Sequence, residues 1–138
     1  MSLELSRLQS LRCGPPGVST PVGEIPREVA EYLQTQFRTV NLSRDTLEKV
    51  NKRHSDLSDF VFLEIPHLLR HGLWMGENRK PLCAVTSCEG AYSPLRYKVA
   101  IKRAINGPEL WLTSFHRVKP KATAALLRRG HVIRAYTS

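Results

Sequence analysis

The sequence lacks an apolar run long enough to cross a bilayer, and its N-terminus lacks the apolar segment of a secretory signal peptide. It has only three cysteines, Cys13, Cys83 and Cys88, an odd number whose spacing does not match a structural zinc site. We therefore expect a soluble cytoplasmic protein with free thiols, without membrane association, and without a metal or other cofactor. It also lacks repeats and low-complexity tracts, so 138 residues most simply form one domain.

Acidic residues are scarce in the last third of the chain. Residues 94–138 contain ten Lys or Arg and one acidic residue, Glu109, whereas residues 1–93 contain eleven of each sign. The whole net charge of +9 therefore belongs to the C-terminal third. Because Lys and Arg drive nucleic-acid binding by neutralising phosphates, this asymmetry favours a polyanionic partner, and nucleic acid before others.

The most strongly patterned segment is a β-hairpin. Two alternating runs, residues 97–104 and 109–115, are joined through Asn106-Gly107, a dipeptide typical of hairpin turns. Lys98 and Lys102 share one face of the first run, where they can contact an anion. The alternative is a hairpin whose lysines are only solvated, as most strand lysines are.

The order of the expected elements gives the fold class. Residues 1–25 contain Gly14-Pro15-Pro16-Gly17 and are expected to form a flexible arm before a single domain over 26–138. Ser43 is a suitable N-cap for a helix that ends at His54, and further helical spacing continues to Gly72. We predict an α+β fold in which N-terminal helices pack on an antiparallel sheet of about four strands, with one late helix.

Three short motifs carry a resemblance to a known family. Residues 45–54 begin Asp-Thr-Leu and end Lys-Arg-His, a later helix closes with Ile65-Pro66-His67-Leu68-Leu69, and the second hairpin run reads Glu109-Leu-Trp-Leu-Thr-Ser-Phe-His-Arg117. Over about residues 42–129 the chain resembles the phage-type branch of the barnase, EndoU, colicin and RelE-like nuclease superfamily. The resemblance implies a nuclease-like domain with its active site across the sheet, and a ribonuclease or toxin activity.

The resemblance also implies roles for particular residues. The helix-end histidine of the family matches His54, its strand lysine matches Lys98 or Lys102, and its late hydroxyl pair matches Thr113 and Ser114. Thr113 and Ser114 point to opposite faces of a regular strand, so both can line one site only at a bulge or a strand end. A helix-end histidine without this resemblance would more often be a cap or a packed neutral ring.

His116 and Arg117 stand where many members of the superfamily have an aromatic and a basic residue, which leaves the acid and base assignment open. RNA cleavage without a metal needs a base, an acid and a cation at the phosphate, and histidine suits both proton transfers. The expected catalytic residues are His54, Lys102, Thr113, Ser114 and His116. The expected phosphate- or nucleic-acid-binding residues are Arg96, Lys98, Arg103, Arg117, Lys119 and Lys121.

Recognition of single-stranded RNA also calls for an aromatic side chain that stacks on a base. The candidates are Trp74, Tyr92, Tyr97 and Trp111, and the core or its rim is the favoured place for all four.

The first hypothesis is a metal-independent endoribonuclease, a toxin-like or phage or mobile-element factor that cleaves RNA by attack of the 2′-hydroxyl. The alternative is a catalytically inactive module that binds nucleic acid through the basic C-terminal third. A third reading is a protein-interaction module whose basic face docks an acidic antitoxin or immunity-type protein. Histidine substitutions should abolish activity in the first case and leave binding intact in the second.

Overall fold

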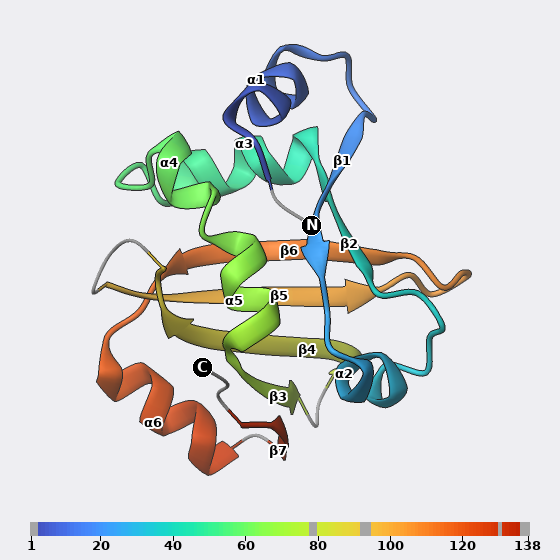
Figure 1. Ribbon diagram of the computed structural model, residues 1–138, viewed down its shortest axis with the longest axis vertical. Coiled ribbons are helices and arrows are strands. Elements are labelled where there is room, and N and C mark those ends of the chain that lie inside the picture. Colours follow the sequence, from blue (N-terminus) through green and yellow to red (C-terminus); the bar gives the residue numbers. More distant parts are fainter. Residues whose placement is uncertain (1–2, 78–79, 92–94, 130, 136–138) are drawn as a thin grey trace.

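The computed structural model describes residues 3–77, 80–91, 95–129 and 131–135. Within these ranges the chain forms six helices and one seven-stranded sheet (Figure 1). The helices are α1 (Leu5–Cys13), α2 (Arg27–Tyr32), α3 (Arg44–Arg53), α4 (Asp59–Phe62), α5 (Ile65–His71) and α6 (Pro120–Arg129). The strands are β1 (Ser19–Glu24), β2 (Thr39–Ser43), β3 (Leu73–Glu77), β4 (Lys80–Glu89), β5 (Arg96–Arg103), β6 (Leu110–Arg117) and β7 (His131–Arg134).

The strands follow the order β1-β2-β6-β5-β4-β3-β7. Neighbours are antiparallel except β2 and β6, which pair in parallel through Val40 and Asn41 opposite Leu110 and Trp111. The α+β class is as predicted, but the expectation of N-terminal helices on about four antiparallel strands is wrong. The sheet is larger and mixed, and strands β1 and β2 precede α3.

Strand β1 shows why the sequence pattern predicted too few strands. It contains Pro21 and Gly23, residues that weaken a strand signal, and its register with β2 shifts between them. An edge strand tolerates proline because one row of its backbone groups needs no partner.

Residues 3–25 do not form the flexible arm expected from their glycines and prolines. Leu8 and Val22 are fully buried in the main core, and β1 pairs with β2 along its length. Arg12 also forms an ion pair with Asp59 at 2.6 Å, which joins α1 to α4. The Gly14–Gly17 stretch is therefore only the connection between α1 and β1.

Helix α5 passes across one face of the sheet, in front of the strands in Figure 1, and packs against β1, β4 and β5. Gly72 ends this helix and donates its N–H to the Leu68 carbonyl at 2.9 Å. A Cβ at this position would lie 2.7 Å from that carbonyl oxygen and would collide with the Thr86 hydroxyl. Glycine therefore allows the close approach of α5 to β4.

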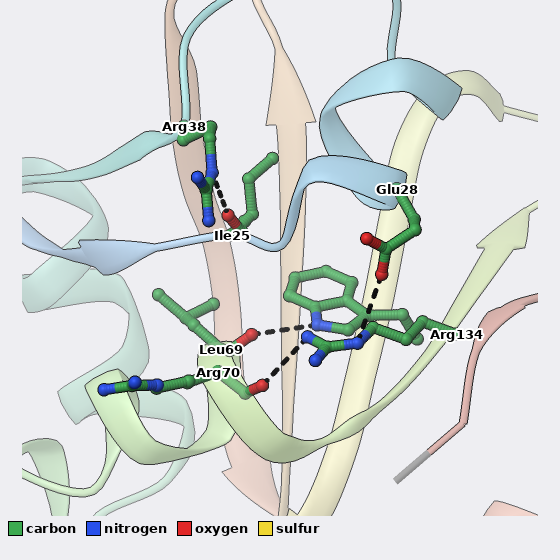
Figure 2. A network of polar contacts seen from close by, with 7 residues as sticks. Ile25, Glu28, Arg38, Leu69, Arg70 and Arg134 are labelled. Carbon is green, nitrogen blue, oxygen red and sulfur yellow. Dashed lines mark hydrogen bonds and ion pairs between the residues drawn. The ribbon is translucent and has the colours of Figure 1, made fainter. Parts of the chain in front are cut away.

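A polar network holds the C-terminal strand in place (Figure 2). Arg134 of β7 forms an ion pair with Glu28 of α2 at 3.2 Å and donates to the Arg70 carbonyl at 3.1 Å. In the same region, the Arg38 side chain donates a hydrogen bond to the Ile25 carbonyl oxygen at 2.8 Å. Four arginines and two glutamates border the open hollow of about 420 Å³ at this junction.

The three cysteines are free thiols, with Cys13 exposed and Cys88 buried. Burial raises the pKa of the Cys88 thiol to about 11, so this thiol stays protonated at neutral pH. None of the helices within the described ranges has both the length and the apolar character needed to span a membrane.

Candidate functional site

Strands β5 and β6 form a two-stranded ribbon with one core face and one opposite face. Val99 and Ile101 of β5 are fully buried in the main core. Because side chains alternate along a strand, the opposite side of β5 carries Lys98, Ala100 and Lys102. We call this other side the second face. Directly paired residues share a face, so the second face of the ribbon carries three cross-strand pairs. They are Lys98–His116, Ala100–Ser114 and Lys102–Trp111.

Two histidines meet at one end of this ribbon. His54 caps the C-terminus of α3, where its N–H donates to the Val50 carbonyl at 2.9 Å, and α3 packs beside β6. His116 is the last residue but one of β6. The two rings stack with their centroids 5.0 Å apart and an interplanar angle of 21°. The structure thus brings together the two imidazoles that the sequence singled out.

The hydrogen bonding of His116 fixes the position of its proton. Nδ1 lies 3.0 Å from the Arg117 carbonyl oxygen, and a carbonyl can only accept. The neutral ring that makes this bond therefore carries its proton on Nδ1 and keeps a lone pair on Nε2. Such a ring can accept a proton from a substrate.

Burial is the main reason why the pKa of His116 is lowered from the ordinary value of 6.5. The positive charges of Lys98 and His54 lower this pKa further, while the Arg117 carbonyl and the Asp56 carboxylate act in the opposite direction. At neutral pH the His116 imidazole is accordingly present mainly in its neutral, basic form.

The histidine pair has charged neighbours of both signs. Lys98 lies directly across the ribbon from His116, and Arg117 forms an ion pair with Asp56 at 3.8 Å. Arg117 and Asp56 are each about half exposed, so their ion pair is weak and Arg117 can readily bind another anion instead. Sequence reasoning missed Asp56, although it lies only two residues beyond His54.

Lys102 and Thr113, expected beside the histidines, lie toward the other end of the ribbon. Lys102 is four residues from Lys98, roughly 13 Å along an extended strand. Both residues border an open hollow of about 450 Å³ together with Lys80, Leu82, Cys83 and Ile105. Lys98, rather than Lys102, is therefore the strand lysine next to the histidine pair.

The two predicted hydroxyls lie at a β-bulge, the condition under which both can lie on one face. The register of β5 and β6 shifts so that Ala100 faces Ser114 and Ile101 faces Leu112, which leaves Thr113 as the extra residue. The Thr113 hydroxyl donates to the Ala100 carbonyl at 3.2 Å. Ser114 lies on the second face between the histidine end and the Lys102 end.

The other predicted phosphate-binding residues are dispersed. Arg96 lies at the histidine end of β5, opposite Glu89, whereas Arg103 at the far end donates to the Gln34 carbonyl at 3.0 Å. Lys119 and Lys121 are exposed at the start of α6. Arg96, Lys98 and Arg117 of the predicted set therefore belong to the histidine end, whereas Arg103 lies at the other end of β5.

His67 and His71 lie one turn apart on α5, with their ring centroids 4.8 Å apart. In the part of the chain that the structure describes, no group of three or more His, Cys, Asp or Glu side chains is placed to hold a metal ion.

Comparison of the chain with protein-family models, with curated protein sequences and with solved structures gives no match.

Proposed function

We propose that the protein is a metal-independent endoribonuclease whose active site is the histidine end of the ribbon. The observation that carries the proposal is the stacked pair of His54 and His116 with Lys98 directly opposite His116. Two imidazoles next to a cation are the groups that metal-free cleavage of RNA requires. The sequence motifs support membership of the phage-type branch of the nuclease superfamily that the chain resembles.

The proposed reaction uses His116 as the base and His54 as the acid. Nε2 of His116 takes the proton of a 2′-hydroxyl, and the resulting oxygen attacks the adjacent phosphorus. The bond from phosphorus to the 5′-oxygen then breaks, and the protonated His54 ring gives its proton to that oxygen. The products are a 2′,3′-cyclic phosphate and a free 5′-hydroxyl.

Cations beside the pair stabilise the negative charge that builds on the phosphorane. Lys98 lies across from His116, and Arg117 can exchange its half-exposed carboxylate partner, Asp56, for a phosphate oxygen. Contacts that strengthen in the transition state contribute about 3–4 kcal/mol each in comparable sites. The electrostatic effect of His54 lowers the pKa of His116, which supports His116 as the neutral ring that acts as the base.

In this proposal the protein acts on cytoplasmic RNA as a toxin-like or phage or mobile-element factor. The excess of ten cationic residues over one acidic residue in residues 94–138 supports RNA as the partner. The same charge would favour an acidic antitoxin or immunity-type protein as an inhibitor.

The proposal is tested with an RNA oligonucleotide and the same sequence with every 2′-hydroxyl replaced by hydrogen. We expect cleavage of the RNA and none of the 2′-deoxy form, because the attacking group is then absent. Cleavage of both would contradict the mechanism. Salt-dependent binding of the RNA without any cleavage would favour the inactive binding module instead.

The pH dependence of cleavage gives a second prediction. Since His116 must be neutral and its pKa is lowered, kcat/KM should decline toward acid pH with a midpoint below 6.5. Lys98→Gln removes a charge that lowers this pKa and should move the acid limb to higher pH, whereas Asp56→Asn should move it to lower pH. If the acidic limb of the pH profile moved in the same direction in both variants, its midpoint would report the pKa of a group other than His116.

A further inference from the structure

Trp111 is the aromatic side chain of the second face. Trp74, the other of the two tryptophans, is fully buried and donates its Nε1–H to the Leu69 carbonyl at 2.9 Å. Tyr97 is also buried, and Tyr92 lies outside the described residues. Trp111 is only partly buried, because its neighbours Leu110 and Leu112 take the core positions of β6. Trp111 therefore lies on the second face and is not enclosed in the core.

A cation and apolar groups accompany this ring. Trp111 is the direct cross-strand partner of Lys102, and Lys102 borders the hollow lined by Leu82 and Ile105. Ile105 is 73% exposed, so its side chain is open to a ligand at the rim of the hollow. An aromatic ring, apolar side chains and lysines together suit a nucleotide, whose base is flat and apolar on its faces and whose phosphate is anionic.

The ribbon connects this hollow with the histidine pair. Between the Lys98–His116 pair and the Lys102–Trp111 pair lie Ala100 opposite Ser114 and the bulge residue Thr113, so small side chains separate the two ends. The separation of roughly 13 Å along β5 exceeds the backbone length of one nucleotide in an extended strand. A nucleotide at Trp111 would therefore lie outside the two nucleotides that flank the cleaved bond.

We propose that Trp111, together with the hollow of Lys80, Leu82, Cys83, Lys102 and Ile105, is a subsite for a nucleotide of single-stranded RNA beyond the cleaved dinucleotide. This inference rests on the proposed function. The RNA strand runs along the second face of the ribbon, with the cleaved phosphate at Lys98, a later phosphate at Lys102 and a base stacked on Trp111. The substrate is thus an unpaired segment longer than a dinucleotide.

The first test compares a dinucleotide with an RNA oligonucleotide of eight or so nucleotides, a length within the range that single-strand-binding modules cover. Trp111→Ala should lower kcat/KM for the oligonucleotide by about 5- to 150-fold, the usual effect of losing one base–aromatic stack, and leave the dinucleotide unchanged. Lys102→Gln should act in the same direction. Matched controls are Phe37→Ala, at a phenylalanine that is 53% exposed, and Lys49→Gln on α3. Equal losses for both substrates, or none, would overturn the subsite.

The second test does not depend on cleavage. Cys83 borders the hollow, whereas Cys13 is exposed at the end of α1. A non-cleavable 2′-O-methyl RNA oligonucleotide should slow the alkylation of Cys83 by iodoacetamide and leave the rate at Cys13 unchanged. An unchanged rate at Cys83 under saturating oligonucleotide would refute the subsite.

The two failures can be told apart. Cleavage of RNA without protection of Cys83 retains the proposed function and removes the subsite. Protection of Cys83 in a protein that cleaves no RNA retains the subsite as a binding site and removes the proposed function.

Discussion

Replacement of His116 by alanine is expected to lower kcat/KM for RNA cleavage by about 10²- to 10⁴-fold, the usual contribution of one general acid or base. His116 holds a lone pair on Nε2 because its Nδ1 proton is directed to the Arg117 carbonyl. Alanine removes the proton acceptor and leaves Lys98, on the neighbouring strand, to bind phosphate. RNA binding and its salt dependence should therefore be retained.

His54→Ala should cause a loss of the same order, because it removes the proposed acid. The two residues act on one reaction, so that the double variant should be little worse than either single one. His67→Ala is the matched control, since His67 pairs with His71 on α5 instead. Single-turnover cleavage measures the effect, and RNA binding by gel shift serves as the reference. Loss of binding in parallel with loss of cleavage would contradict the assignment of catalysis to these rings.

Phe115→Ala is expected to lower the free energy of unfolding by about 3–5 kcal/mol. Phe115 directly precedes His116 and is fully buried. Its ring packs edge-on against Phe62 of α4, with the ring centroids 5.2 Å apart, and beside Tyr97 of β5, with the centroids 5.7 Å apart. The change removes these aromatic contacts and leaves a cavity under the site. The melting temperature should fall by more than about 10 °C in a domain of this size.

Phe37→Ala makes the same chemical change at an exposed position and should alter stability by less than about 0.5 kcal/mol. If Phe115→Ala does not fold, Phe115→Leu keeps most of the volume and should give a smaller but measurable loss. Equal effects of the substitutions at positions 115 and 37 in urea unfolding would contradict the packing described here.

Local signals in the sequence predicted the elements that carry the histidines. Ser43 caps α3 as expected, with its hydroxyl accepting from the Thr46 N–H at 3.1 Å, and the helix ends at His54. The alternation of residues 97–104 and 109–115 predicted the ribbon of β5 and β6. The Asn106-Gly107 turn is longer than a two-residue hairpin, because the Ala104 N–H donates to the Glu109 carbonyl. These features depend on near neighbours in the sequence.

What the sequence did not reveal depends on distant pairings. The parallel contact of β2 with β6 joins residues about seventy positions apart, and no local pattern specifies it. The choice between Lys98 and Lys102 required the register, since both share one face of β5. The sequence favoured the core or its rim for Trp111, and only the register places it opposite Lys102. Asp56 had no motif, and only its ion pair with Arg117 marks it.

The measurement that tests the central claim most directly is the incubation of the purified protein with RNA in EDTA, followed by mass spectrometry of the fragment ends. The His116→Ala variant is treated in parallel. The account predicts fragments with 2′,3′-cyclic phosphates and free 5′-hydroxyls, formed without a divalent metal and lost in the variant. Intact RNA, or fragments that the variant produces equally well, would contradict the assignment of a ribonuclease site to His54 and His116.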